Sequence, residues 1–160
     1  SIHEDSMLDE VNEIIKIAKN NNVKVHIPVD VVCAKEFDNN SPAKVFDIMN
    51  IDKDYEGMDA GPKSLLKFKE VVLNSKTILW NGPLGVFEFS NFSKGTKELG
   101  KYISESTQNG AFSLVGGGDS VAAVKSFKMQ KNMSYVSTGG GAMLESLEGK
   151  NLPGINALLK

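Results

Sequence analysis

The chain has 160 residues, which is enough for one domain with a continuous apolar core. Hydrophobic residues form 41% and charged residues 24% of the sequence, as in ordinary globular proteins, and no apolar run reaches the ~18 residues of a membrane-spanning helix. The formal net charge is −2 with both signs interspersed, so there is no basic stripe, and we expect neither nucleic acid nor a membrane as partner.

Cysteine content and the first residues indicate the cellular setting. Cys33 is the only cysteine, which excludes an internal disulfide and a cysteine-ligated metal site and favours a reducing compartment, so we expect the cytoplasm. The N-terminal residues show neither an initiator methionine nor a signal-peptide pattern, and we expect a cut end at Ser1. Such a cut should expose a sheet edge and apolar surface, so we expect self-association.

The first third of the chain predicts a helix, a strand and a polar excursion. Residues 6–20 place apolar side chains three or four positions apart, which predicts a surface helix. Residues 23–32 are rich in β-branched side chains and predict a strand buried on both faces. The polar stretch 35–57 is interpreted as an excursion from the main sheet, with a candidate edge strand at 43–48.

The remaining residues predict alternating helices and strands. Pro62 opens a helix that is followed by a strand at 77–80, and Ser93 is expected to cap the next helix. The later predicted elements are a strand at 111–115, a helix capped by Asp119 or Ser120, a strand at 133–136 and a helix at 142–147. Because no hairpin pattern interrupts this alternation, we expect an open parallel sheet in a three-layer α/β/α sandwich of Rossmann-like type.

The loop Gly116-Gly117-Gly118-Asp119 lies between a predicted strand and a predicted helix. Backbone N–H groups and the positive helix end converge there, and glycines let a phosphate approach the backbone. Asp119 would bind a magnesium ion that arrives with a nucleotide. The alternative is that Asp119 only caps the helix and the glycines only form a tight connection.

A second glycine loop repeats this arrangement. Ser137-Thr138-Gly139-Gly140-Gly141 follows the next strand and again opens a helix, so two helix N-termini would face one crevice at the carboxyl edge of the sheet. The sequence contains neither the P-loop pattern Gly-x-x-x-x-Gly-Lys-Ser/Thr nor the dinucleotide pattern Gly-x-Gly-x-x-Gly.

A third loop, from Trp80 to Glu88, offers an amide, a Gly-Pro corner and a carboxylate. Glu88 is a candidate for hydrogen bonds to ribose hydroxyls, and the alternative is a solvent-facing glutamate beside a core Phe87. Trp80 and Phe92 are interpreted as core or lid packing, and Cys33 as a buried structural thiol.

Together and in this order, the three loops resemble signatures of the phosphoglycerate kinase family. Pro28-Val29-Asp30, Asp59-Ala60-Gly61-Pro62 and Leu152-Pro153-Gly154 are similar to further signatures of that family, so the resemblance covers essentially all 160 residues. It implies the later part of the C-terminal domain, which binds magnesium-ATP or magnesium-ADP. By this resemblance residues 1–160 are part of one incomplete nucleotide-binding domain, and the N-terminal domain that binds 3-phosphoglycerate is absent.

The resemblance also implies roles for individual residues. Asp119 is similar to the carboxylate that faces the nucleotide-bound magnesium, and Glu88 to the glutamate that binds the ribose. The implied phosphate contacts are Gly117, Gly118 and Ser120 at one helix terminus and Gly139, Gly140 and Gly141 at the other; Gly117, Gly118, Gly140 and Gly141 would stabilise the phosphoryl group during transfer. The other implied contacts are Asn81 and Pro83, near the phosphates and base, and Met58 and Val86, as walls of the adenine pocket.

The implied reaction is reversible phosphoryl transfer from 1,3-bisphosphoglycerate to ADP, giving 3-phosphoglycerate and ATP, with hinge closure that excludes water. The family's earlier glycine-and-lysine loop, its basic substrate cluster and its interdomain helix are missing, so we expect this chain alone to be inactive. Ser120 stands where threonine is usual and Met58 where leucine is common, and we expect little change from either. The full-length protein is expected to be monomeric. The alternative function is a non-catalytic nucleotide-binding or interaction module.

Overall fold

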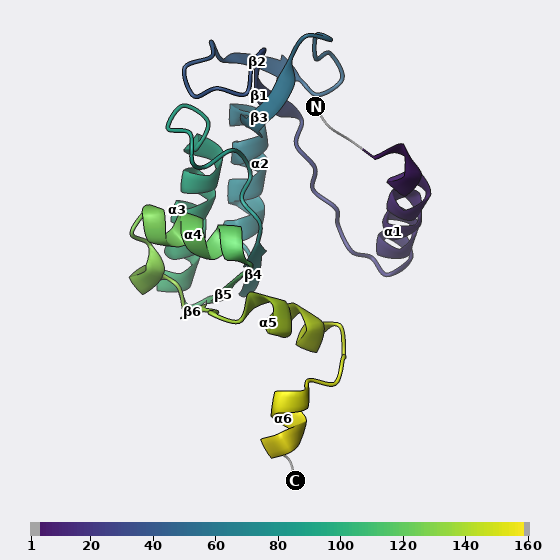
Figure 1. Ribbon diagram of the computed structural model, residues 1–160, viewed down its shortest axis with the longest axis vertical. Helices are drawn as coiled ribbons and strands as arrows, with labels where there is room; N and C mark the ends of the chain where they lie inside the picture. The colour runs from purple at the N-terminus through teal and green to yellow at the C-terminus, as the bar shows by residue number, and fades with distance from the viewer. Residues whose placement is uncertain (1–3, 159–160) are drawn as a thin grey trace.

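The computed structural model describes residues 4–158, which form two small sheets and the helices around them (Figure 1). The helices are α1 (Leu8–Asn20), α2 (Pro62–Leu73), α3 (Lys94–Gln108), α4 (Gly118–Ser126), α5 (Gly140–Leu147) and α6 (Pro153–Leu158), with 3-10 turns η1 (Asp5–Met7) and η2 (Gln130–Asn132). The strands are β1 (Asp30–Ala34), β2 (Lys44–Asp47), β3 (Glu56–Ala60), β4 (Thr77–Asn81), β5 (Phe112–Gly116) and β6 (Tyr135–Val136). No helix within residues 4–158 is both long enough and apolar enough to span a lipid bilayer.

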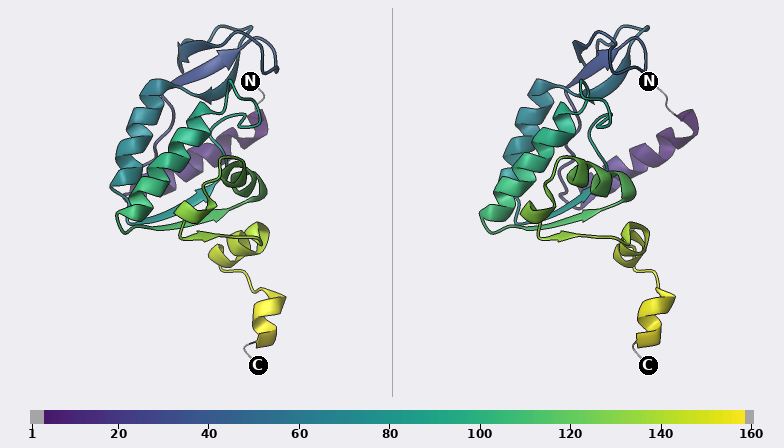
Figure 2. Two further views of the ribbon diagram at one scale, coloured as in Figure 1. Left: turned by 90° about the vertical axis from the view of Figure 1, so that its left-hand side faces the viewer. Right: turned by 60° about the vertical axis from the view of Figure 1, so that its left-hand side comes forward.

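The second half of the chain forms the predicted parallel sheet, with strand order β4-β5-β6. Helices α2 and α3 lie side by side above it, and α4 packs next to α3 (Figures 1 and 2). Trp80, Ile103, Val115 and Val124 form the buried cluster between this sheet and its helices, and Trp80 is only 4% exposed. The α/β class with an open parallel sheet is therefore confirmed.

The domain is incomplete on the opposite face of the parallel sheet. Leu79, Phe112 and Tyr135 project from β4, β5 and β6 and are 44%, 51% and 58% exposed. Side chains of successive strand residues alternate between the two faces, so these apolar groups mark the face away from Trp80 and Val115. The apolar surface on this face is therefore exposed, as we expected, whereas self-association stays a prediction.

The first three strands form a separate antiparallel sheet with the order β2-β1-β3, so the expectation that all strands run parallel is wrong for this part. The candidate edge strand at 43–48 is confirmed as β2, but β3 was not predicted. Its sequence Glu-Gly-Met-Asp-Ala has little of the β-branched and aromatic content on which strand recognition depends. The sheet has its own aromatic contact, because Phe46 of β2 packs edge-on against Tyr55, which precedes β3, with ring centroids 4.9 Å apart.

The predicted strand at 23–32 is shorter in the structure, where only β1, from Asp30 onward, is a paired strand. Val23, Val25 and Ile27 are 59%, 52% and 62% exposed. A strand needs a neighbouring strand to bond its N–H and C=O groups, and none of the strands within residues 4–158 pairs with 23–27.

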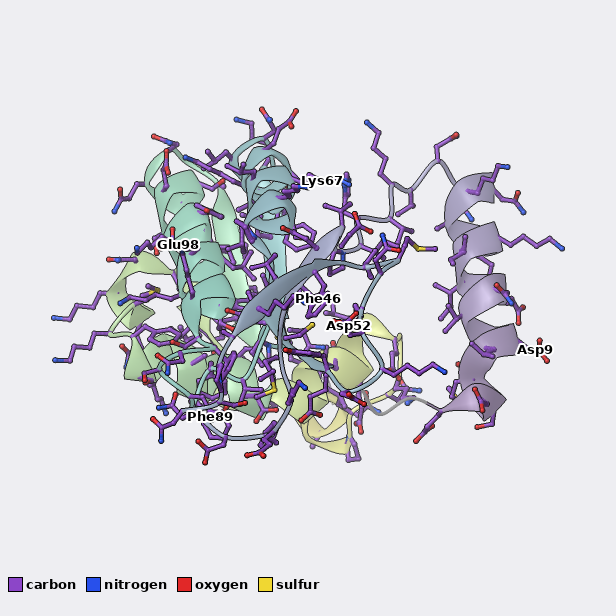
Figure 3. All side chains as sticks on the ribbon, turned by 90° about the horizontal axis from the view of Figure 1, so that it is seen from above. Asp9, Phe46, Asp52, Lys67, Phe89 and Glu98 are labelled. Carbon is purple, nitrogen blue, oxygen red and sulfur yellow. The ribbon has the colours of Figure 1, made fainter. Side chains whose placement is uncertain are left out.

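Helix α1 is confirmed as a surface helix. It stands apart from the rest of the molecule and is joined to β1 by residues 21–29 (Figures 1 and 3). Leu8, Val11 and Ile15, which the periodicity placed on one face, are 56%, 48% and 51% exposed. This helix therefore carries an apolar face that the described residues leave open to solvent.

Three expectations about single residues are confirmed by their burial. Trp80, Phe92 and Cys33 are 4%, 0% and 0% exposed, as expected for core side chains and a structural thiol. The expected cap at Ser93 is not formed, since its hydroxyl donates to Ser90 O instead.

Candidate functional site

The glycine turn between β5 and α4 has a backbone conformation that requires glycine. Gly117 has φ 84° and ψ 141°, and a Cβ atom there would lie 2.5 Å from Asn81 Oδ1. Helix α4 begins at Gly118, and its first closing bond runs from Val121 N–H to Gly117 O. The N–H groups of the first turn therefore have no acceptor inside the helix.

The expectation that Asp119 or Ser120 caps α4 is wrong. The positive φ of Gly117 turns the chain into the helix earlier, so Gly117 occupies the cap position and no side chain caps the helix. Asp119 lies exposed in the first helical turn. The capping role expected of this aspartate is therefore wrong, and its exposed carboxylate in the first turn of α4 is accessible to a ligand.

Ser120 connects the glycine turn to the loop after β4. Its side chain is fully buried, and Oγ accepts a 2.5 Å hydrogen bond from the N–H of Gly82. Trp80 secures the same residue from the other side, since Nε1 donates to Gly82 O at 2.8 Å. The Ser120 hydroxyl thus faces the protein, and the residue as a whole is buried, so its direct role is to fix Gly82.

The start of α5 packs directly against the glycine turn. A Cβ atom at Gly140 would lie 2.6 Å from Gly117 N, and one at Gly116 would overlap Met143 Cε of α5. Two helix N-termini, those of α4 and α5, are therefore adjacent, as the sequence predicted. Between them is a cavity of about 170 Å³, and its lining includes Gly117, Gly118 and Gly140.

Two residues of this cavity were missed from the sequence. Val121 and Lys125 of α4 line it together with Gly118. The spacing of three and then four residues from Gly118 places both on one face of the helix, and that pattern would have identified them once the helix start was known. Among the described residues that line this cavity, Lys125 contributes the one positive side chain.

A second cavity, of about 220 Å³, brings together Met58 and Val86, the two predicted adenine-pocket walls. Met58 is 2% exposed, and its carbonyl accepts a 2.9 Å hydrogen bond from the N–H of Val86. Asp59 also lines this cavity and was not identified as a site residue from the sequence. Asp59 belongs to the motif Asp59-Ala60-Gly61-Pro62 that supported the family resemblance, but nothing in the local sequence distinguishes a buried site aspartate from a solvent-facing one.

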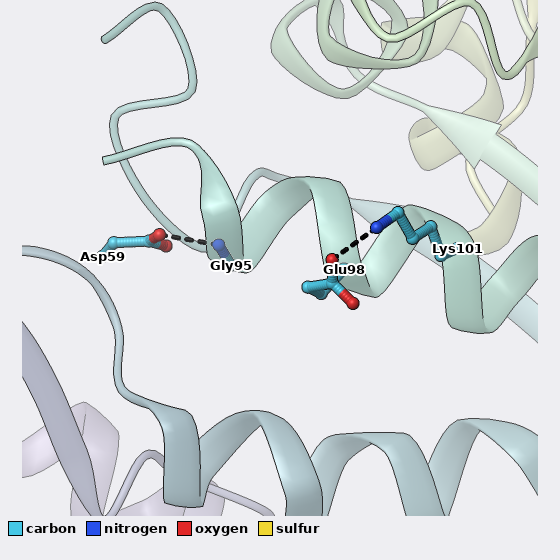
Figure 4. Close-up of polar contacts among 4 residues, drawn as sticks. All are labelled: Asp59, Gly95, Glu98 and Lys101. Atoms are coloured by element: carbon cyan, nitrogen blue, oxygen red, sulfur yellow. Dashed lines mark hydrogen bonds and ion pairs between the residues drawn. The ribbon is translucent and has the colours of Figure 1, made fainter. Parts of the chain in front are cut away.

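Asp59 is 4% exposed and lies at the N-terminus of α3 (Figure 4). Its carboxylate accepts hydrogen bonds from Gly95 N at 2.6 Å and from Ala60 N at 2.8 Å. Burial raises the pKa of Asp59 to about 6, although these two N–H groups and the charge of Lys94 favour the ionised form.

The other predicted residues lie around these two cavities. Asn81 and Pro83 occupy the loop between them, and the Asn81 amide faces Gly117. Glu88 is exposed and lines neither cavity, while the neighbouring Phe87 packs edge-on against Phe127 at 6.5 Å. Both interpretations of Glu88 stay open.

The roles predicted for Gly139 and Gly141 of the second glycine loop likewise stay predictions. Gly139 caps α5 and donates its N–H to Ser137 Oγ at 3.3 Å, whereas Gly141 is exposed in the first turn of α5. Neither lines the 170 Å³ cavity that Gly140 helps to form.

The metal chemistry of the site rests on one carboxylate. Within residues 4–158 there is no cluster of three or more His, Cys, Asp or Glu side chains that could hold a metal ion. Mg²⁺ often binds proteins through one or two carboxylates, with phosphate and water oxygens completing its shell. Asp119 beside the two helix N-termini fits that mode of binding.

Comparison with known proteins gives the family. The family model described as phosphoglycerate kinase matches residues 1–150. The chain belongs to the phosphoglycerate kinase family. Its relatives include phosphoglycerate kinases from Porphyromonas gingivalis, with 56% identity over 99% of this chain, and from Borrelia turicatae, with 48% identity over the whole chain.

Solved phosphoglycerate kinase structures share the fold. The structure from Coxiella burnetii covers 96% of this chain at 41% identity with a TM-score of 0.90, and that from Pyrococcus horikoshii covers 96% at 32% identity with a TM-score of 0.75. The chain spans only 38% of the P. gingivalis relative, 40% of the B. turicatae relative and 39% of the C. burnetii structure. It therefore corresponds to less than half of a phosphoglycerate kinase.

Proposed function

We propose that this chain is the magnesium-nucleotide-binding part of a phosphoglycerate kinase, acting in the cytoplasm on ADP and ATP. The observation that carries the proposal is the meeting of two helix N-termini at Gly117 and Gly140, beside the uncapped first turn of α4 and the free carboxylate of Asp119. Such an arrangement favours a phosphate group, because helix dipoles and unpaired N–H groups both attract negative charge.

The residues divide between the two ends of the nucleotide. Gly117, Gly118 and Gly140 would hold the phosphates, with Gly141 in the first turn of α5 next to them. Met58 and Val86 would contact the base in the second cavity, and Asn81, Pro83 and Glu88 belong to the loop that connects the two ends. Ser120 would contribute through its buried hydroxyl, which fixes Gly82 in the loop beside the phosphates.

Phosphoryl transfer requires positioning and charge neutralisation more than covalent chemistry from the protein. Here the N–H groups at the starts of α4 and α5 would stabilise negative charge that develops on the phosphoryl oxygens, and Lys125 adds a positive side chain to the same cavity. Magnesium bound with the nucleotide supplies further positive charge. The acceptor or donor in the whole enzyme is 3-phosphoglycerate or its acyl phosphate, bound mainly by the part that relatives have and this chain lacks.

The role of Asp119 is tested by isothermal titration calorimetry of this chain with ADP, with and without magnesium. Asp119→Asn should weaken binding of magnesium-ADP by about tenfold and change binding of metal-free ADP little, because one metal-carboxylate contact is lost. Asp9→Asn is the matched control, since Asp9 lies in the first turn of α1, away from the site (Figure 3). Equal losses with and without magnesium would remove Asp119 from metal binding.

The enzymatic part of the proposal is tested by complementation. This chain, mixed with the upstream portion of a phosphoglycerate kinase relative, should regain kinase activity that neither piece has alone. Tight nucleotide binding without any recovery of activity would favour the alternative, a non-catalytic nucleotide-binding module.

A further inference from the structure

Asp59 connects the end of a strand, a loop and a helix start in a way that its hydrogen bonds alone do not reveal. Besides bonding Gly95 N and Ala60 N, its carboxylate lies in space that side chains at two glycines would occupy. A Cβ atom at Gly85 or at Gly95 would overlap Asp59 Oδ1. The loop containing Gly85 and the first turn of α3 therefore both pack against this one buried carboxylate.

The same loop is held by two further contacts. Thr96, fully buried in α3, accepts hydrogen bonds at Oγ1 from Leu84 N at 3.1 Å and Gly85 N at 3.3 Å. Val86 N–H bonds to Met58 O of the strand that carries Asp59. Residues 84–86 thus have no freedom to leave β3 without breaking buried hydrogen bonds.

We propose that Asp59 is a positioning residue for the nucleobase side of the site, an inference that rests on the function proposed above. Its carboxylate holds the start of α3 and the loop 84–86 together, and the cavity of about 220 Å³ between Met58 and Val86 exists in the shape that this contact imposes. Apolar side chains such as Met58 and Val86 bind the base of a nucleotide by contact, so the distance between them should affect affinity for the base and not for the phosphates.

Asp30 provides a matched control within the same chain. It is 3% exposed and accepts hydrogen bonds from Lys63 N at 3.0 Å and Ser64 N at 2.7 Å, at the start of α2. A Cβ atom at Gly61 would overlap its carboxylate, just as one at Gly95 would overlap that of Asp59. Asp30 therefore performs the same structural task at another helix, whereas the carboxylate of Asp59 also packs against Gly85 of the loop 84–86.

The first measurement compares two ligands, magnesium-ADP and magnesium-pyrophosphate, by calorimetry. Asp59→Asn should weaken magnesium-ADP by about tenfold and leave magnesium-pyrophosphate unchanged, because only the nucleotide uses the base cavity. Asp30→Asn should leave both affinities unchanged although it lowers stability. Equal weakening of both ligands by Asp59→Asn, or the same ADP loss in Asp30→Asn, would overturn the proposal.

The second measurement needs no ligand and separates this inference from the proposed function. The amide proton of Val86 should exchange with solvent at least about tenfold faster in Asp59→Asn than in Asp30→Asn, because only the first variant frees the loop. Gly95→Ala and Gly61→Ala disturb the same two carboxylates from the glycine side and replace the asparagine variants if either does not fold. If the wild-type chain bound no nucleotide, the proposed function would fail, but faster Val86 exchange in Asp59→Asn than in Asp30→Asn would still support Asp59 as the residue that positions the loop. Equal Val86 exchange in the two variants would overturn the inference.

Discussion

Replacing Gly117 by alanine tests whether the glycine turn is held in a strained and crowded conformation. With φ 84° and ψ 141°, the position lies in a region that glycine alone adopts readily, and alanine there should cost about 1–3 kcal/mol. The new methyl group would lie 2.5 Å from Asn81 Oδ1, and turning the Asn81 side chain away should add about 1 kcal/mol. We therefore expect Gly117→Ala to lower the free energy of unfolding by about 2–4 kcal/mol.

Urea unfolding followed by circular dichroism measures this change, and two further variants separate its parts. Gly110→Ala is the control for backbone strain, because Gly110 has φ 94° and open space where its Cβ would lie. The contact with Asn81 is measured by a double-mutant cycle with Asn81→Ala, which should show a coupling of about 1 kcal/mol. If the two substitutions were additive within about 0.5 kcal/mol, the crowding argument would be refuted even though Gly117→Ala was destabilising.

Four further outcomes follow from the described contacts. Ser120→Ala should lower the free energy of unfolding by about 1–3 kcal/mol in urea melts, because the buried N–H of Gly82 loses its acceptor. The wild-type protein should lose stability relative to Asp59→Asn as pH rises from about 4 to 6, because the folded state holds a proton on Asp59 that the unfolded chain has already released; a pH-independent difference between their urea midpoints would contradict this. Asp30 should behave oppositely. Burial opposes its ionisation, but the hydrogen bonds from Ser64 and Lys63 outweigh burial and lower its pKa. The stabilisation from Asp30 is therefore complete above the unfolded-state pKa and is lost as pH falls below it. The chain should self-associate through the exposed face of α1, and Ile15→Gln should reduce the apparent mass in light scattering, whereas a monodisperse wild-type monomer would exclude this.

The glycine loops could be recognised from the sequence because each one separates a β-branched or aromatic run from a helical pattern. That local order is enough to place Gly117 and Gly140 at helix starts on one edge of a parallel sheet, and the structure confirms their proximity. The start of α4 was misjudged by a small margin, since capping preferences of Asp119 and Ser120 were outweighed by the positive φ of Gly117.

Other elements could not be predicted because their conformation depends on partners elsewhere in the chain. Strand β3 forms because β1 bonds it, not because Glu-Gly-Met-Asp-Ala favours a strand, and residues 23–27 stay irregular because no described strand bonds them despite their strong β propensity. The same reasoning explains why Asp59 was missed, since its significance comes from Gly85 and Gly95, which lie 26 and 36 positions further on.

The sequence by itself determined the α/β class, the parallel sheet of the second half, the two glycine turns and the family resemblance. The first three depend on hydrophobic periodicity and on glycine at positions where the backbone must turn, both of which are local properties, whereas the resemblance depends on the loop motifs. The tertiary structure alone decided that the first strands form their own antiparallel sheet, that the Ser120 hydroxyl binds Gly82, and that Asp59 joins β3, α3 and the loop 84–86. Each of these is a contact between residues distant in the sequence, and the free energy that selects it comes from burial and hydrogen bonding that no local pattern records.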